Sequence, residues 1–297
     1  MIKPTRQKTK LTRAPRADKL NLSRDILHLL SRNEDFMTLK RLFNATRAEF
    51  SPPKADIWQQ ETFNEYIVFL KRLGLARVSR PIIRILDRGK TIVGCSDYGQ
   101  EELGAFEKQI FKSLLLAYNP FKDFLSVSFC EGQSFHKERE LFEKSKCPKR
   151  KDVLEAYLNA HGQKDDREVR TMLYWGIQVG LIEFDEYHNR FFLVNPRKLG
   201  QDSLIDELFK AYNKSQDFKT GLALIPEVRF LTCCSLKISK TIFDNNLIRQ
   251  FKSQPSIIEL GKASTSRIEV QKYGVTDKKS YYYYIRINKR EKNAKGY

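Results

Sequence analysis

Apolar residues recur at intervals of three and four through most of the chain, which is the spacing of amphipathic helices. Helices are expected near residues 21–30, 35–43, 57–73, 101–119, 151–160, 165–179, 204–212, 226–232 and 239–251. Gly74 and Gly180 each follow an apolar stripe, and glycine readily adopts the left-handed conformation that closes a helix. The pattern therefore predicts a mainly helical protein.

Short segments of alternating or continuous apolar residues interrupt the helices and predict strands. They lie at residues 75–78, 82–86, 181–184, 190–194, 257–260 and 281–287. After the second strand, residues 87–90 are expected to form a turn that leads into an extended segment at 91–93. A long basic loop separates the last two strands. The expected sheets are small, and each follows a group of helices.

Two helix-to-strand junctions resemble each other closely. Leu73-Gly74-Leu75 and Val179-Gly180-Leu181 each join an amphipathic helix to an alternating strand, and the order of three helices followed by a small sheet recurs along the chain. In this order the chain resembles tandem winged helix-turn-helix DNA-binding proteins over about residues 20–290. More loosely, it is similar to multi-winged-helix recognition components of bacterial restriction or phage-defence systems.

The resemblance implies a mainly α fold with small β-wings (α+β), built from three tandem winged helix-turn-helix units. The expected organisation is a basic arm that is disordered when free (1–19), a first winged helix (20–98), bridging helices (99–135), a second winged helix (136–200), a third winged helix (201–290) and a basic tail (291–297). In this family the third helix of each unit enters a major groove and the wing touches the DNA backbone.

The charge of the chain is large and uneven. The 297 residues include 54 Lys+Arg and 36 Asp+Glu, a formal net charge of +18. Residues 1–20 hold seven bases and one acid (+6), and residues 262–297 hold ten bases and three acids (+7), which leaves +5 for the 241 residues between them. Cationic ends of this kind favour a polyanionic partner, most often nucleic acid. A solvated tail and an acidic protein or lipid surface remain alternatives.

The resemblance also indicates which side chains face DNA. Asn and Arg can bond adenine and guanine bidentately, whereas wing cations meet phosphates. On the exposed helix faces the candidates are Lys240, Thr241, Asn245, Asn246, Arg249, Arg167, Arg170, Thr171 and Gln178. In the wings they are Arg80, Arg84, Arg88, Lys90, Arg190, Lys262, Arg267, Lys272, Lys278 and Lys279. Glu61 and Glu65 would repel phosphate, so the first recognition helix is a candidate for binding protein instead.

The tests for an enzyme or a metal site are negative. The acid and the base of Glu269-Val270-Gln271-Lys272 are one residue too far apart for a nuclease E-x-K motif, and Asp87-Arg88-Gly89-Lys90-Thr91 lacks the upstream glycines of a phosphate loop. The five cysteines include no C-x-x-C pair, so we expect reduced thiols, no disulfide framework and no zinc. No catalytic residue, metal or cofactor is expected.

The sequence therefore predicts a cytoplasmic, non-catalytic protein that binds duplex DNA as part of a larger assembly. The apolar runs are too short to cross a membrane and no secretory signal is expected. The main alternative is a winged-helix adaptor that docks partner proteins in a nucleic-acid-processing or defence complex. An RNA-binding protein and a nuclease with an unrecognised site also remain open.

Overall fold

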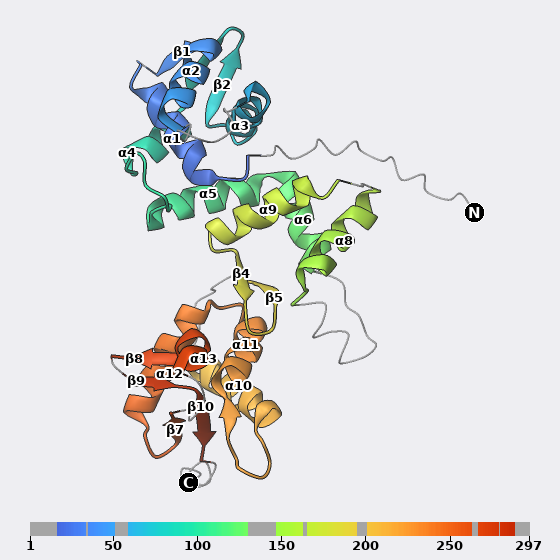
Figure 1. The fold of residues 1–297 in the computed structure, drawn as a ribbon, viewed down its shortest axis with the longest axis vertical. Helices are drawn as coiled ribbons and strands as arrows, with labels where there is room; N and C mark the ends of the chain where they lie inside the picture. The colour runs from blue at the N-terminus through green and yellow to red at the C-terminus, as the bar shows by residue number, and fades with distance from the viewer. Residues whose placement is uncertain are drawn as a thin grey trace, which may run out of the picture. The chain divides into compact units, whose positions relative to one another are not determined.

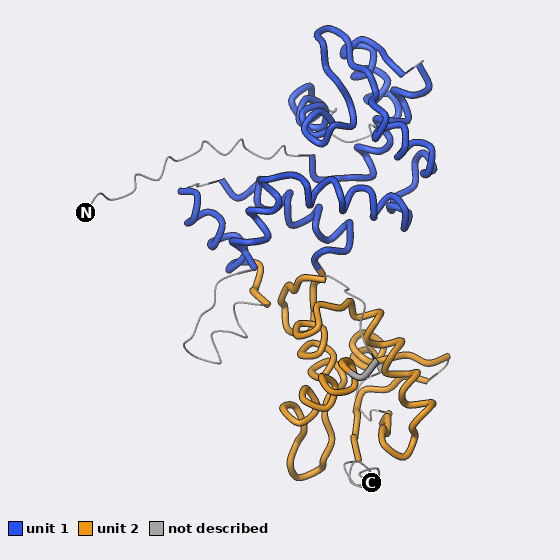
Figure 2. Tube along the Cα trace, turned by 180° about the vertical axis from the view of Figure 1, so that it is seen from behind, with its two compact units in different colours: residues 1–136, 151–182 blue, residues 137–150, 183–297 orange. Residues whose placement is uncertain are grey.

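The computed structural model describes residues 17–33, 35–50, 59–129, 147–162, 165–194, 201–262, 267–278 and 280–288. The chain divides into two compact units (Figure 2): unit 1 holds residues 1–136 and 151–182, and unit 2 holds residues 137–150 and 183–297. The expected class is confirmed, since the protein is mainly helical with small antiparallel sheets (Figure 1). The division after residue 182 falls inside the segment expected as the second winged helix. Most of the basic arm (1–16) and the basic tail lie outside the described residues.

Unit 1 is built around a helical core with one small sheet. Its helices are α1 (Leu20–Ser31), α2 (Leu39–Phe50), α3 (Gln60–Arg72), α4 (Asp87–Gly94), α5 (Ala105–Ala117), α6 (Asn119–Phe129), all but the first residue of α8 (Arg150–His161), and α9 (Arg167–Gln178). Its strands are β1 (Phe36–Thr38), β2 (Ala76–Ser79) and β3 (Ile82–Ile85), in the order β1-β3-β2. The buried face of the sheet carries Met37, Ile83 and Ile85.

The structure corrects two expectations about this unit. Phe36, expected as the first apolar residue of a helix, lies in strand β1, which pairs with β3 antiparallel. The expected turn at 87–90 and extended segment at 91–93 are instead the single helix α4. Helix α4 passes close to the core at Gly89, where a Cβ atom would overlap the carbonyl oxygen of Leu75. A residue without a side chain therefore lets this helix approach the sheet.

The two similar glycine junctions have the same geometry. Gly74 and Gly180 have φ of 68° and 69°. The N–H of Leu75 donates to the carbonyl of Leu70 at 2.9 Å, and the N–H of Leu181 donates to that of Gly176 at 2.8 Å. This hydrogen bond runs from the residue after a left-handed glycine back into the last turn of the helix, and it commonly accompanies such a glycine. The sequence repeat thus predicted a real structural repeat.

Helix α9 is fixed in unit 1 by Trp175, which is fully buried. Its indole N–H donates to the carbonyl of Ala17 at 2.6 Å, and its ring lies 4.7 Å from that of Phe69 on α3. Ala17 is itself fully buried. Ala17, which was expected to belong to the basic arm, is therefore part of the packed core of unit 1.

A buried arginine organises the loop between α4 and α5. Arg24, fully buried on α1, bonds Asp25 at 2.9 Å and the carbonyl of Glu102 at 3.2 Å, and it also donates to the carbonyl of Gln100. Glu107 lies 3.5 Å from the same guanidinium. A buried cation is tolerated only with such partners, so this network fixes the loop against α1.

Unit 2 repeats the order of elements seen at the start of unit 1. Its helices are α10 (Gln201–Ser215), α11 (Ile225–Leu236), α12 (Lys240–Ser253) and α13 (Arg267–Tyr273). Its strands are β4 (Ile182–Asp185, of which Ile182 belongs to unit 1), β5 (Arg190–Leu193), β6 (Ala223–Leu224), β7 (Ile258–Gly261), β8 (Val275–Asp277), β9 (Ser280–Tyr282) and β10 (Tyr284–Ile287). The main sheet has the order β6-β10-β7, so the last strand is again central. Its core includes Leu208, Val228, Phe243, Ile258 and Ile285.

Unit 2 also departs from expectation in its last third. The long basic loop contains helix α13, and the strand expected over 281–287 is divided at Tyr283 into β9, which pairs with β8, and β10. Cys147 and Cys234 form a disulfide, which corrects the expectation that all the thiols are reduced. Cys95 and Cys233 are free, and Cys130 lies outside the described residues.

We expect Gly89→Ala to destabilise unit 1 by about 1–3 kcal/mol, because the new methyl group overpacks a site closed by backbone. Gly94→Ala in the same helix is the matched control: nothing lies within 4 Å of the position that its methyl group would take, so it should leave unit 1 unchanged or slightly more stable. Trp175 is fully buried in unit 1, so urea unfolding followed by tryptophan fluorescence reports the unfolding of this unit. Equal midpoints for the two variants would contradict the close approach at Gly89.

Candidate nucleic-acid interface

Helix α12 is held in a fixed orientation by its cap and its core residues. Lys237, in the left-handed conformation at φ 54°, ends α11, and two residues later the Ser239 Oγ accepts the Ile242 N–H at 3.2 Å to begin α12. Phe243 and Leu247 are buried on the inner face. The two helices are thus joined by a three-residue turn, and α12 exposes Thr241, Asn245 and Arg249 on its outer side.

The outer face of α12 presents three hydrogen-bonding side chains in a row. Thr241, Asn245 and Arg249 are exposed and follow one another at intervals of four residues, which places them on one side of the helix. Asn246, a fourth candidate, donates to the carbonyl of Ile242 at 2.7 Å and accepts from Arg249 at 2.7 Å. Its amide orients the guanidinium of Arg249, so Asn246 is a positioning residue in this arrangement.

Lys240, the fifth candidate on this helix, is engaged within unit 2. Its ammonium donates to the carbonyl of Phe184 at 2.8 Å, and its backbone N–H donates to the Glu183 carboxylate at 3.1 Å. Burial raises the pKa of Glu183, although the Lys240 N–H and charge oppose this shift. Lys240 therefore joins α12 to the β4–β5 hairpin and is corrected from a base-reading to a structural residue.

Helix α9 uses two of the four predicted base-reading residues for contacts within unit 1. The Thr171 side chain is buried and donates to the carbonyl of Arg167 at 2.9 Å. The Gln178 amide donates to the carbonyl of Asp18 at 2.7 Å and accepts the Leu20 N–H at 3.0 Å. Thr171 and Gln178 are therefore corrected from base-reading to structural residues.

The two arginines of α9 lie beside carboxylates. Arg170 bonds Asp166 at 2.6 and 2.8 Å, and this hydrogen bond and the carboxylate charge raise the pKa of Arg170. Arg167 is exposed, with its Nε 3.9 Å from Asp165. Local carboxylates thus offset the positive charge of this face.

In unit 1 the predicted wing cations divide between free and paired groups. Arg80 is exposed in the turn between β2 and β3, and Arg84 is exposed on the outer face of β3. Arg88 is exposed on α4, whereas Lys90 on the same helix forms an ion pair with Asp35 at 2.5 Å. Only part of this expected phosphate surface is therefore unneutralised.

The predicted wing residues of unit 2 are similarly divided. Lys262 and Lys278 are exposed. Lys272 forms an ion pair with Glu186 at 3.1 Å and lies over the ring of Tyr273, and its hydrogen bond to Tyr273 and the Glu186 carboxylate raise its pKa. Arg267 is the first residue of α13, and Lys279 lies outside the described residues.

A histidine clamp that the sequence did not reveal fastens the β4–β5 hairpin to α11. The His188 ring lies between two carboxylates, 2.8 Å from Asp185 and 3.0 Å from Glu227, and stacks on Phe230 with ring centroids 4.1 Å apart. Burial lowers the pKa of His188, but the two carboxylates outweigh it and raise the pKa to about 9. Glu227 is 39 residues away in the sequence, so no local motif marks the pair.

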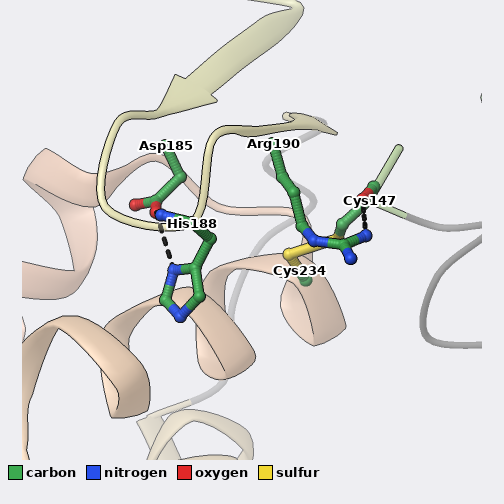
Figure 3. The surroundings of a disulfide bond; sticks show 5 residues. All are labelled: Cys147, Asp185, His188, Arg190 and Cys234. Atoms are coloured by element: carbon green, nitrogen blue, oxygen red, sulfur yellow. Dashed lines mark hydrogen bonds and ion pairs between the residues drawn. A yellow bond between two sulfur atoms is a disulfide. The ribbon is translucent and has the colours of Figure 1, made fainter. Parts of the chain in front are cut away.

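The last predicted wing cation, Arg190, belongs to the same neighbourhood. The Arg190 guanidinium donates to the Cys147 carbonyl at 2.8 Å. Figure 3 shows this bond next to the Cys147–Cys234 disulfide. In the same view His188 and Asp185 face each other across the hairpin turn. Arg190 thus holds the segment at Cys147 and is corrected from a phosphate contact to a structural residue.

Among the described residues, no cluster of three or more His, Cys, Asp or Glu side chains could hold a metal ion. Within the same part of the chain, no helix combines the length and apolar character needed to cross a bilayer. Comparison with protein-family models, with curated proteins and with solved structures finds no match. Any function assigned to the chain therefore depends on the side chains described above.

We expect the His188 clamp to stabilise unit 2 in a pH-dependent way. Because the folded pKa of about 9 exceeds the unfolded value of 6.5, the stabilisation is complete below pH 6.5 and is lost as the pH rises through about 9. Relative to wild type, His188→Gln should lose at most about 3 kcal/mol at pH 6 and much less at pH 10.

Urea unfolding followed by circular dichroism at pH 6 and pH 10 measures this difference in the free energy of unfolding. The lysines and tyrosines that titrate between these pH values are the same in both proteins, so their effect cancels in the comparison. If the variant were equally destabilised at pH 6 and pH 10, packing on Phe230 rather than charge would hold the ring.

Proposed function

We propose that the chain is a non-catalytic protein that binds duplex DNA as part of a larger assembly, with α12 as the helix that reads bases. We further propose that it is built of three tandem winged helix-turn-helix units and acts in the cytoplasm. The support for the fold is topological. Unit 1 begins with α1-β1-α2-α3-β2-β3 and unit 2 contains α10-β6-α11-α12-β7-β10, each with its last strand in the centre of the sheet. Helices α8 and α9 with the β4–β5 pair supply the remaining unit of the proposal.

The observation that carries the proposed function is the exposed row Thr241, Asn245 and Arg249 on α12. An α-helix fits the major groove, where Asn pairs bidentately with adenine and Arg with guanine. The hydrogen bond from Arg249 to Asn246 holds the guanidinium in place and uses no carboxylate, so its charge stays available to a base or phosphate. On α9, by contrast, the corresponding groups are buried, bonded to backbone or beside acids.

Cations outside α12 would supply affinity without sequence discrimination. Lys262 and Lys278 are exposed in unit 2, and the two ends of the chain carry +6 and +7 over residues 1–20 and 262–297. Each phosphate contact releases counterions, so binding through such groups weakens steeply as salt rises. Base contacts by α12 should therefore dominate the binding that persists at higher salt.

An adaptor that docks proteins in a restriction or phage-defence complex is the second candidate. Its support is the exposure of two large apolar side chains, Phe106 at 61% on α5 and Phe218 at 91% after α10. Glu61 is also exposed on α3, a charge that disfavours phosphate at that helix. These groups suit protein contacts, and they lie on elements other than α12.

The test is selection of binding sites by the full chain from a random duplex library at about 200 mM salt, followed by variants. We expect an enriched motif, and we expect Arg249→Ala to weaken binding to it by about 5–150-fold, the effect of one lost bidentate base contact. Lys210→Ala is the matched control, since this exposed lysine of α10 is ion-paired with Glu207 and its loss changes the net charge equally. Equal effects of the two variants, or no enriched motif, would reject α12 as a reading helix and favour the adaptor.

A further inference from the structure

The outer face of the unit 1 sheet carries an unusual set of side chains. Across the strands, Phe36 lies opposite Arg84, which lies opposite Arg77, and all three are exposed. The next exposed row contains Ile82, beside Thr38 and Ser79. Phe36 and Ile82 are each 42% exposed. The face therefore combines accessible apolar surface with a pair of adjacent cations.

The placement of the two arginines is unfavourable for the isolated protein. Like charges directly opposite each other on neighbouring strands destabilise a sheet. Among the residues that the structure describes, neither Arg77 nor Arg84 has an ion-pair partner, and the Arg84 guanidinium lies 5.7 Å from the centroid of the Phe36 ring. An anion bound on this face would offset the repulsion.

Unit 2 provides an internal comparison. Its main sheet has the same strand order, and its central strand β10 also directs an exposed arginine, Arg286, outward. Arg286 lies directly opposite Glu259 on β7, with 3.7 Å between guanidinium and carboxylate. The equivalent position in unit 1 is thus occupied by a second arginine where unit 2 has a glutamate. The excess charge is specific to the unit 1 sheet.

We propose that the outer face of the β1-β3-β2 sheet binds an unpaired nucleic-acid strand, with one base stacked on Phe36 and its phosphates at Arg77 and Arg84. Surfaces that bind single strands combine aromatic side chains with a cationic groove, because every base has a flat face for stacking. Bases inside a duplex offer only their edges, so an exposed aromatic ring beside two arginines matches unpaired bases better. Arg80, exposed at the β2–β3 turn, extends the cationic surface.

This inference rests on the proposed function in one respect, namely that the chain binds nucleic acid. It assigns a second surface with a different substrate: α12 for a duplex and the unit 1 sheet for an unpaired strand. The two surfaces can therefore be tested by separate variants on separate probes, and the failure of one does not entail the failure of the other.

The experiment measures fluorescence anisotropy of the full chain with three probes: a 20-nucleotide oligo-dT, a 20-nucleotide oligo-rU, and the duplex selected by the full chain. We expect Phe36→Ala to weaken binding to the single strands by about 5–150-fold, the effect of one lost stacking contact, and Phe36→Tyr to restore it. The double variant Arg77→Ala, Arg84→Ala removes two phosphate contacts. The salt slope, which is the slope of log affinity against log salt concentration, should therefore decrease in magnitude by about 1.4 for the single strands. Arg286→Ala is the matched control, because Arg286 is paired with the carboxylate of Glu259. This variant should change neither the affinity for the single strands nor the salt slope.

A second measurement covers the case in which Phe36→Ala perturbs strand β1. An oligonucleotide with 5-iodouridine is irradiated with the wild-type chain, and the crosslinked peptide is expected to contain residue 36. Oligo-dT and oligo-rU offer the same stacking and phosphate contacts, so a difference between their affinities identifies whether the site prefers DNA or RNA.

Three results would overturn the inference. Unchanged oligo-dT and oligo-rU affinity in the Phe36 and double-arginine variants would remove the site. Equal losses on the single strands and the duplex would show a backbone contact without stacking. Displacement of oligo-dT by poly-glutamate, with no effect of Phe36→Ala, would identify an acidic polypeptide as the occupant. In each case the duplex affinity of the Arg249→Ala variant still decides the proposed function independently.

Discussion

The hydrogen bond from the buried indole of Trp175 to the Ala17 carbonyl constrains the whole of unit 1. An indole N–H inside an apolar core needs an acceptor, and here the acceptor is backbone that precedes the first helix. The segment that supplies it must therefore lie along α9, where Gln178 bonds the next residues, while the other side of the indole packs on Phe69 of α3. One polar atom in the core thus fixes the backbone at Ala17 against α9 and helps to explain why part of the surface of that helix is covered.

The elements that the sequence predicted well are those determined by local chemistry. Long amphipathic stripes gave α3, α9 and α12, and the alternating segments gave the β2–β3 and β4–β5 pairs. The two Gly-Leu junctions were recognisable because a left-handed glycine and the backward hydrogen bond are properties of a few consecutive residues. Strand β1 was missed, since three residues are too few to show alternation, and Phe36 also fits the helical spacing of α2. Helix α4 was missed because its glycine was interpreted as a turn residue, although it allows close packing.

The candidate interface was harder to predict, because exposure depends on partners that are distant in sequence. Gln178 and Lys240 have the spacing of reading-face residues, yet their partners are 158–160 and 56–57 residues away. Thr171 shows the same difficulty at short range, because a threonine on a helix can bond its own preceding turn. Thr241, Asn245 and Arg249 differ from these only in facing solvent. Periodicity identified the polar faces of the helices, but it could not separate the polar residues that the fold already uses from those left available.

The same distinction applies to charge. A net charge of +18 indicates a strongly cationic protein, but many cations on the folded units are matched: Lys90 by Asp35, Arg170 by Asp166 and Lys272 by Glu186. Matched exposed pairs add little net attraction for a polyanion, and salt weakens the attraction of exposed cations in general. Selectivity for one form of nucleic acid then has to come from cations that are not matched by a carboxylate and are held in a defined geometry. Among the described residues, Arg249 beside Asn246 and Arg84 opposite Arg77 meet that condition, one on a convex helix and the other on a flat sheet. A helix that enters a groove and a ring that stacks on an unpaired base make different kinds of contact, so the two proposed surfaces would suit different states of nucleic acid.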